Sequence, residues 1–254
     1  SSASIGGILL LPHHSCSGTS NKKLTINGIS NYQIVIPNNP SKIEKEASNQ
    51  LKEHLLLLSS KAPKIINETK YVGRNGIFIG KTKYVNNNNI DTNTLEEDGF
   101  MFKNSGDDFF IQGGSEKGLL FGVYSLLESF GFRKYAADDP LDIPSTINLE
   151  LPNDVIKVPK INYRTTNYYE GRDSEYADWN KLSSSDSWGL FVHTFEVLVP
   201  PEKYGESNPE YYSLINGKRN VVTQLCLTNQ DMFDVLVKDL RKRINENPKA
   251  KYWS

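Results

Sequence analysis

The sequence predicts an α/β protein: a small α+β sandwich, with a mostly antiparallel sheet carrying two helices on one face, followed by a partial (β/α) barrel. Short apolar runs with period-two alternation are interspersed with two long helical patterns, which predicts the sandwich. Four prolines between positions 140 and 159 predict a connector between two domains. After it, strand patterns alternate with a helix pattern, as in βαβ units. About 100 residues remain there, too few for a complete barrel of about 200 or more.

Composition narrows the function classes. A net charge of -1 over 254 residues provides no electrostatic footprint for nucleic acid and does not favour anionic membranes. Two cysteines are too few for a disulfide framework. No metal or other cofactor is predicted, because the chain has no glycine-rich phosphate loop and its histidines lack HxH or HExxH spacing. Those histidines are at 13, 14, 54 and 193.

Residues 1–21 resemble the end of a bacterial lipoprotein signal peptide and its polar tether. An apolar run from Ala3 to Leu11, too short to span a bilayer, is followed closely by Cys16. The resemblance implies lipidation at Cys16 and secretion to the periplasm or outer cell surface, with membrane contact only through the lipid. The alternative is an apolar N-terminal strand that packs on the body of the protein.

Residues 22–152 are predicted to form the first domain. Its first helix follows from a capping box, Ser41 with Glu44, and from apolar residues at helical spacing. The run GIFIG is apolar throughout, as expected of a strand covered on both faces. His54 is interpreted as a packed side chain without chemistry. The elements predicted here are strands at 24–26 and 32–36 around the turn Asn27-Gly28, a helix at 41–58, and strands at 64–67 and 76–80.

The stretch from 98 to 134 predicts a hairpin that leads into a helix. Two apolar pairs with period-two spacing form the strands, a turn sequence separates them, a serine caps the helix and a glycine ends it. These residues are Phe100 with Phe102, Phe109 with Ile111, the turn 104–107, Ser115 and Gly131.

Gly118 and Gly122 lie inside this helix, where each costs about 1 kcal/mol relative to alanine. Their spacing of four leaves one flat face, which predicts a close approach of the helix to the sheet. The alternative is that both are merely tolerated in a strong helix.

The order of these features resembles the small α/β domain that precedes the catalytic barrel in β-hexosaminidases and α-glucuronidases. The likeness is greatest to a bacterial family of the same two-domain plan, domain of unknown function 4838. It implies a structural role for the first domain, with no catalytic residue before about position 155.

Residues 153–254 are predicted to begin the barrel. Val-Pro-x-Ile-x-Tyr-Arg, ending at Arg164, looks like the opening strand of the family's barrel. Because the carboxyl ends of barrel strands face the active site, the resemblance implies that Arg164 contacts sugar hydroxyls; a surface salt bridge is the alternative. An apolar strand at 188–195 directs His193 into the same pocket, unless backbone groups satisfy a buried imidazole.

A third strand is predicted at 223–229, a helix at 231–244 and a fourth strand from 251. Gln224, Thr228 and Asn229 are further pocket candidates, and Cys226 is interpreted as a small buried apolar group. Trp188 is one of many aromatic residues that offer flat faces to sugars or simply pack. The loop 200–219 resembles a family loop, although Asn208 replaces a histidine there, and Asn216-Gly217 predicts a hairpin.

These observations favour a secreted glycan-processing protein that binds carbohydrate, as in polysaccharide utilisation. The predicted activity is glycoside hydrolysis of the hexosaminidase or α-glucuronidase type. The two carboxylates that act as acid and base are expected to lie beyond this chain. No carboxylate has a context that marks it as catalytic; Glu170, Asp173, Glu196 and Glu202 occupy plausible loops. The alternatives are a non-catalytic carbohydrate-binding protein and a surface structural module on the same scaffold.

Overall fold

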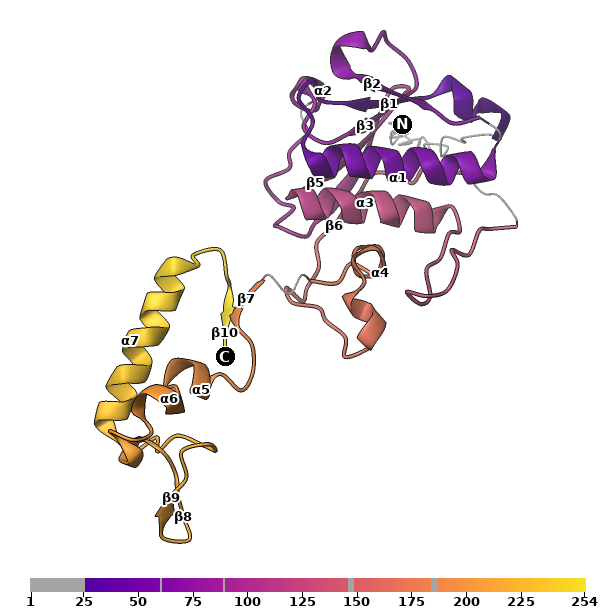
Figure 1. Cartoon of the computed structure of the whole chain (residues 1–254). Coiled ribbons are helices and arrows are strands. Elements are labelled where there is room, and N and C mark those ends of the chain that lie inside the picture. Colours follow the sequence, from indigo (N-terminus) through magenta and orange to yellow (C-terminus); the bar gives the residue numbers. More distant parts are fainter. Residues whose placement is uncertain (1–25, 60, 89, 146–148, 184–186) are drawn as a thin grey trace, which may run out of the picture. The chain divides into compact units, whose positions relative to one another are not determined.

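The computed structural model describes residues 26–59, 61–88, 90–145, 149–183 and 187–254. The chain divides into two compact units, Ser1–Lys181 and Leu182–Ser254 (Figure 1). The division falls later than the predicted domain boundary between 152 and 153. The predicted leader and Cys16 lie outside the described residues. None of the helices in the described part of the chain combines the length and apolar character needed to cross a membrane.

A six-stranded mixed sheet forms the first unit, with strand order β2-β1-β3-β5-β4-β6. The first four strands in that order run parallel, and β4 is antiparallel to both of its neighbours. The prediction of a mostly antiparallel sheet was therefore wrong. A helix between β1 and β2 carries the chain back across the sheet, so the second strand starts at the same end as the first. The strands are β1 Gln33–Ile36, β2 Lys64–Asn67, β3 Gly76–Ile79, β4 Phe100–Ser105, β5 Asp108–Gly113 and β6 Val155–Lys157.

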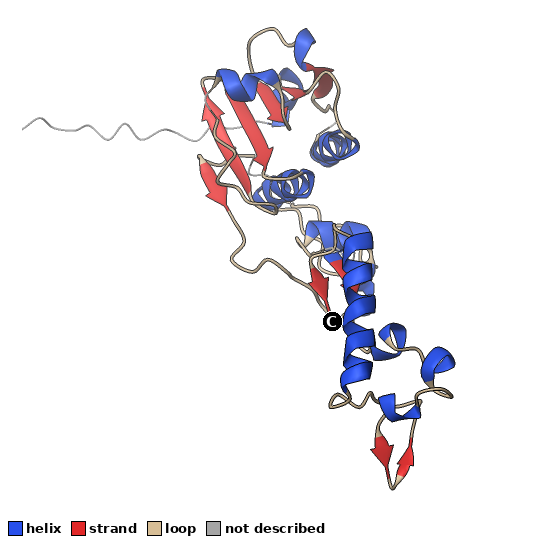
Figure 2. Ribbon diagram, turned by 90° about the vertical axis from the view of Figure 1, so that its left-hand side faces the viewer, coloured by secondary structure: helices blue, strands red, loops and turns tan. Residues whose placement is uncertain are grey.

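Helices α1 (Lys42–Leu58) and α3 (Glu116–Ser129) pack against one face of this sheet (Figure 1). Figure 2 shows both helices nearly end-on beside the strands. Alternate side chains of the strands face the two helices, as Ile34 and Ile36 do in β1. Val35 faces the opposite side, where a second apolar cluster includes residues of α2 (Lys83–Asn87). The central strands β1, β3 and β5 are thus buried on both faces of the sheet.

The capping box predicted at the start of α1 is present. Ser41 Oγ accepts the Glu44 amide at 3.1 Å, and the Glu44 carboxylate accepts the Ser41 amide at 2.8 Å. The same carboxylate also accepts the amide of Lys81, just after β3, at 2.9 Å. Ser115 caps α3 as predicted, accepting the amides of residues 117 and 118. The Glu44 contacts fasten the start of α1 to the end of a sheet strand.

The two glycines inside α3 allow the close approach predicted from their spacing. A Cβ added at Gly118 would lie 2.4 Å from the carbonyl oxygen of Gly99, and one at Gly122 would lie 3.0 Å from Ile111 Cγ2. The packing requires glycine at position 118, where the obstacle is a backbone oxygen, whereas the obstacles at position 122 are side-chain atoms. Gly131 ends the helix with a φ of +106°, in the left-handed region that favours glycine.

A short helix, α4 (Ser174–Trp179), packs on α1 and α3 through one aromatic side chain. Trp179 is 1 % exposed, and its ring centroid lies 4.7 Å from that of Tyr124 and 5.4 Å from that of His54. His54 Nδ1 lies 2.7 Å from the carbonyl oxygen of Gln50. His54 is therefore a packed residue of the core.

The second unit contains a parallel pair of strands, β7 (Trp188–Leu190) and β10 (Tyr252–Trp253). Between them in sequence come α5 Phe195–Leu198, α6 Pro201–Tyr204, the hairpin of β8 Leu214–Ile215 and β9 Lys218–Arg219, and α7 Gln230–Glu246. The hairpin turn is the predicted one, with φ of 50° at Asn216 and 76° at Gly217. The unit has its own apolar core, which includes Val199, Tyr212 and Met232.

Several predicted strands are absent or shorter than expected. A 3₁₀ helix, η1 (Ile26–Asn31), replaces the turn predicted at Asn27-Gly28. The described chain around Ile161 is not a strand; two alternating apolar residues are too few to specify one, and Ile161 is 66 % exposed. Residues 223–229 contribute only an isolated bridge between Tyr212 and Leu225. The described residues of the second unit thus contain one short parallel pair, one hairpin and the helices α5, α6 and α7, and the predicted partial barrel stays a prediction.

Replacing Gly118 by alanine should destabilise the protein, although alanine normally stabilises a helix by about 1 kcal/mol relative to glycine. The new methyl group meets a backbone oxygen, which cannot move without displacing the chain before β4. We expect a loss of about 1–3 kcal/mol in the free energy of unfolding, measured by urea denaturation. Gly122→Ala is the matched control, because it meets side chains that can adjust. Equal stabilisation by both substitutions would contradict the close packing at Gly118.

Burial of His54 predicts a pH-dependent loss of stability. Burial lowers the pKa of His54 from its ordinary 6.5, outweighing the Gln50 carbonyl and the carboxylates of Glu175 and Glu53, which raise it. As the pH falls, His54 is therefore protonated in the unfolded chain before it is protonated in the folded protein. The stability that neutral His54 contributes is fully present above pH 6.5 and is lost as the pH falls toward the lower pKa of the folded state. His54→Phe should keep the ring packing and lose less stability between pH 7 and 5. Parallel melting-temperature profiles of the two proteins would contradict this account.

Candidate functional site

The second unit contains a cavity of about 350 Å³ at the carboxyl ends of β7 and β10. It brings together His193 and Gln224, two of the residues predicted from the sequence to line a pocket. The full lining among the described residues is His193, Thr194, Phe195, Glu196, Thr223, Gln224 and Ser254. Residues far apart in the chain thus converge on one hollow.

The backbone at the edge of this cavity adopts an unfavourable conformation. After β7 ends at Leu190, Val192 has a φ of 31° and His193 a φ of 56°. Left-handed backbone is rare for a β-branched residue and costs free energy that the surroundings must offset. The hydroxyl of Thr194 donates to the carbonyl of Ser254 and helps to hold the turn. Such strained positions are frequent at functional sites.

The lining can both donate and accept hydrogen bonds. His193 and Gln224 each offer a nitrogen and an acceptor, Thr223 offers a hydroxyl, and Phe195 offers an apolar ring. Glu196 is the only carboxylate side chain among the described lining residues, and the lining includes no lysine or arginine. The sequence places Glu196 in a plausible loop but gives it no spacing or context that distinguishes it from other carboxylates.

Trp188 and Asn229, two other predicted binding residues, do not line this cavity. The Trp188 ring packs against Tyr252, with centroids 5.2 Å apart. Asn229 caps α7, its side-chain oxygen accepting the amide of Met232 at 2.9 Å. For both, contact with a sugar stays a prediction.

Cys226 differs from the buried apolar group expected from the sequence. The side chain is partly exposed, with Sγ 3.5 Å from Thr228 Oγ1. The Thr228 hydroxyl, followed by the guanidinium of Arg219, lowers the pKa of this thiol. The Cys226 thiol therefore lies among polar side chains, and we assign it no binding or catalytic role.

Arg164 belongs to the first unit, and its guanidinium is engaged there. Nη2 forms an ion pair with Asp98 at 2.7 Å, while Nε donates to the carbonyl of Lys181 at 2.8 Å and Nη1 to that of Ile161 at 2.7 Å. The structure thus contains the salt bridge predicted from the sequence as the alternative role of Arg164. The predicted contact of Arg164 with a sugar stays a prediction.

Further ion pairs attach the chain after Arg164 to α3. Lys181 Nζ lies 2.5 Å from a carboxylate oxygen of Glu128, and Lys117 Nζ lies 3.7 Å from one of Asp178. Burial lowers the pKa of Lys181 and raises that of Asp178, although each partner opposes the shift. Together with the packing of Trp179, these pairs explain why the first unit extends to Lys181.

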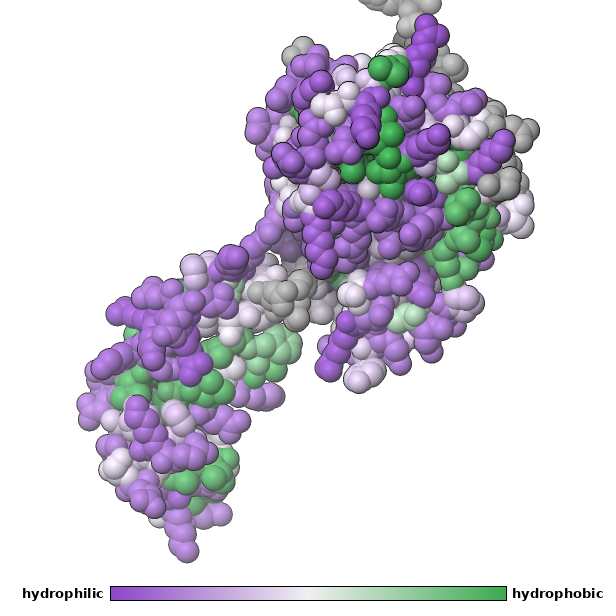
Figure 3. All heavy atoms as spheres, turned by 45° about the horizontal axis from the view of Figure 1, so that its top comes forward, coloured by the Kyte–Doolittle hydropathy of each residue, from purple (hydrophilic) through white to green (hydrophobic). Residues whose placement is uncertain are grey.

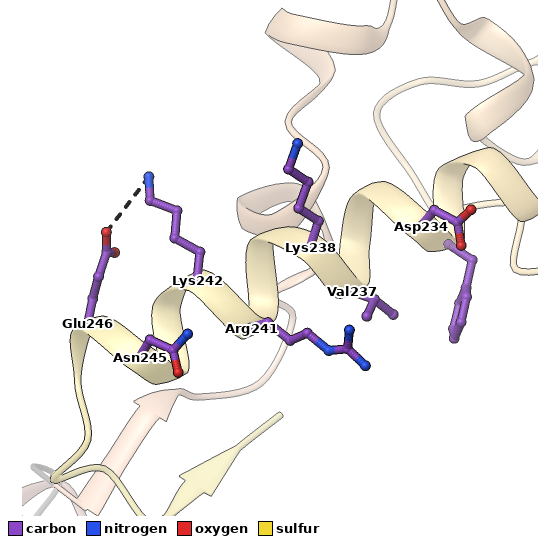
Figure 4. A pocket seen from close by; sticks show the side chains of 8 residues that line it. Asp234, Val237, Lys238, Arg241, Lys242, Asn245 and Glu246 are labelled. Atoms are coloured by element: carbon purple, nitrogen blue, oxygen red, sulfur yellow. Dashed lines mark ion pairs between the residues drawn. The ribbon is translucent and has the colours of Figure 1, made fainter.

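Another hollow in the second unit follows α7 and is lined by that helix alone (Figure 4). Figure 3 shows apolar patches among polar surface on this unit, and Phe233, 47 % exposed, is among its exposed apolar residues. A face of one helix does not enclose a ligand, so this hollow is the weaker candidate. No cluster of three potential metal-binding side chains occurs within the described ranges. The hollow's lining is Phe233, Asp234, Val237, Lys238, Arg241, Lys242, Asn245 and Glu246.

Replacing Arg164 by alanine should weaken the first unit. It removes an ion pair whose side chains are only about one-fifth exposed and leaves two carbonyl groups without this donor. We expect a loss of about 1.5–3 kcal/mol in unfolding free energy, with only partial recovery in Arg164→Lys, which lacks the planar fork. Arg172→Ala, at an exposed position, is the control. Unchanged stability in Arg164→Ala would show that these contacts contribute nothing.

Solved structures of three carbohydrate-active enzymes are similar to parts of this chain. An inactive mutant of the GH20 exo-β-N-acetylglucosaminidase from Vibrio harveyi is 19 % identical over 52 % of the chain and 16 % of its own length, with a TM-score of 0.31. A GH115 4-O-methyl-α-glucuronidase with specificity for decorated arabinogalactans is 16 % identical over 54 % of the chain and 19 % of its own length, with a TM-score of 0.38. A GH138 enzyme targeting pectin rhamnogalacturonan II is 12 % identical over 87 % of the chain and 24 % of its own length, with a TM-score of 0.33.

The chain therefore spans no more than about a quarter of the length of these enzymes. A search of curated proteins finds no match. Two family models match adjoining parts of the sequence: the glycosyl hydrolase family 67 N-terminus matches residues 18–126, and domain of unknown function 4838 matches residues 135–254. These matches confirm the resemblance drawn from the motifs: residues 18–126 are similar to the N-terminus of glycosyl hydrolase family 67, and residues 135–254 are similar to domain of unknown function 4838.

Proposed function

We propose that this chain is part of a carbohydrate-processing protein of glycoside hydrolase type, and that the cavity at His193 is a saccharide subsite. The convergence of His193 and Gln224 on one hollow carries the proposal. The match of residues 18–126 to a glycosyl hydrolase N-terminus supports it. The activity of the complete protein is part of this proposal, because the chain spans about a quarter of the length of the GH138 enzyme.

The lining suits a neutral sugar. Hydroxyl groups donate and accept hydrogen bonds, as do Thr223, Gln224 and a neutral His193. The ring of Phe195, 39 % exposed, offers a flat apolar face to the C–H side of a pyranose. A uronate would face Glu196 without a lysine or arginine from the described lining to offset its charge.

Glycoside cleavage generally requires two carboxylates, about 5–9.5 Å apart. Glu196 supplies one carboxylate to this cavity, and no second one belongs to its described lining. We place Glu196 beside the bound sugar without assigning it the acid or base role. The single carboxylate also favours the second candidate function, a carbohydrate-binding protein without turnover.

Loss of the Gln224 side chain should weaken saccharide binding by about tenfold, the equivalent of one good hydrogen bond. His193→Asn should do the same without added backbone strain, because asparagine tolerates a positive φ. Both variants are made in the full-length protein and measured by glycan-array binding and by hydrolysis of aryl glycosides. Gln230→Ala is the matched control, since this exposed glutamine of α7 bonds only Asp234 through its side chain and does not line the cavity.

The outcomes separate the two candidate functions. Turnover that falls in the Gln224 and His193 variants but not in the control supports an enzyme. Binding without turnover, weakened by the same variants, supports the binding protein. Saccharide binding that both variants leave unchanged would remove this cavity from the proposal.

A further inference from the structure

A second cavity lies in the first unit, at the carboxyl ends of β1, β3 and β5. In the sheet order β2-β1-β3-β5, the chain leaves β1 toward β2 on one side, whereas β3 lies on the other side of β1. The connection after β1 runs through α1 on one face, and the connection after β3 runs through α2 on the opposite face. Open α/β sheets bind their ligands at such a switch in strand order, where the departing connections leave a crevice.

The cavity has a volume of about 330 Å³ and is formed by segments that follow all three strands. Asn39 and Ser41 come from the connection after β1, Lys81 from that after β3, and Gln112 from the end of β5. Pro37 and Leu119 supply apolar wall. This volume is at the lower end of the range of small-molecule pockets, about 300–1,000 Å³.

Gln112 gives the cavity a buried polar group with unused capacity. The residue is 1 % exposed, and its Nε2 donates to the carbonyl oxygen of Gly80 at 2.8 Å. No described residue donates to its side-chain oxygen. The side-chain oxygen can therefore accept a hydrogen bond from a hydroxyl group that enters the cavity, while the amide nitrogen stays bonded to Gly80. Gln112 thus gives the cavity a hydrogen-bond acceptor whose position is fixed by burial and by the bond to Gly80.

The remaining chemistry disfavours an anion. The starts of α1 and α3 point amides toward this region, but Ser41 Oγ, Ser115 Oγ and the Glu44 carboxylate already accept amides there. Glu44 and Glu116 place two carboxylates in the lining against one lysine, Lys81. A phosphate or carboxylate would therefore find few free donors and a net negative surrounding.

We propose that this cavity binds a small neutral ligand rich in hydroxyl groups, of the size of one sugar ring. Hydroxyl groups can satisfy the Gln112 oxygen and the polar rim at Asn39, while ring C–H groups lie against Leu119. The site shares no residue with the cavity at His193, so it adds a second saccharide site to the chain and does not depend on the first.

The test is a titration of the ¹⁵N-labelled 254-residue chain, followed by two-dimensional amide NMR. D-Xylose, D-glucose and N-acetyl-D-glucosamine are the neutral probes; D-glucuronate, inorganic phosphate and D-glucosamine are the charged ones. We expect at least one neutral probe to shift the amides of Gly80, Lys81 and Gly113 with a dissociation constant on the order of 1 mM.

Two variants connect the shifts to the cavity. Asn39→Trp blocks its exposed rim without touching the core, and Gln112→Met removes the amide at nearly constant volume. Each should weaken binding by about tenfold or more. Asn49→Trp, on the exposed face of α1 and outside the lining, is the matched control, and His193→Asn should leave these shifts unchanged.

Three outcomes would overturn the proposal. The first is the absence of shifts at these amides with any probe. The second is a response to D-glucuronate, phosphate or D-glucosamine alone, which would assign the cavity to charged ligands. The third is full binding by the Asn39→Trp protein, which would place the ligand elsewhere.

Discussion

Contact between backbones at the start of α3 holds the first unit together. Gly118 lies against the carbonyl of Gly99, and the amide of Gly114 donates to that same carbonyl at 2.9 Å. A side chain at Gly114 would overlap the carbonyl of Glu96. Helix α3, the β4–β5 hairpin and the segment before β4 can meet only if these positions carry no Cβ. This is why the motif contains glycines in this order.

This contact also places the acidic residue next to Gly99. Asp98 is held where it pairs with Arg164, some sixty residues later in the chain, and the pair fastens the segment after the proline-rich connector to the first unit. The Trp179 side chain and the Lys181–Glu128 pair continue that attachment. Residues matched by domain of unknown function 4838 thus complete the core of the preceding domain.

The parallel part of the sheet has a consequence for binding. An antiparallel sheet with hairpin connections does not gather strand ends of one polarity at one edge, whereas β1, β3 and β5 end side by side here. The loops that follow them therefore converge on a common hollow. In the second unit the same logic acts on a smaller scale, since the parallel strands β7 and β10 end at the cavity that contains His193.

Local chemistry was readable from the sequence, and long-range pairing was not. The Ser41–Glu44 capping box, the Ser115 cap, the Asn216-Gly217 turn and the flat glycine face of α3 depend on neighbours within a few residues, and each was predicted correctly. The motif order also identified the family matches. Of the candidate site, His193 and Gln224 were predicted, whereas Glu196 was not singled out.

Strand direction, the partner of Arg164 and the turn at Val192 were decided by tertiary structure. A period-two pattern records which side chains are buried but not which strand lies alongside, so the parallel order of β1, β2 and β3 left no local signal. The same apolar run that reads as a strand up to Phe195 turns at a positive φ, because contacts from elsewhere in the unit offset the local strain. The sequence by itself determined the three long helices, the caps at Ser41 and Ser115 and the Asn216-Gly217 turn. Only the folded chain, through contacts between distant segments, determined which polar groups share a cavity.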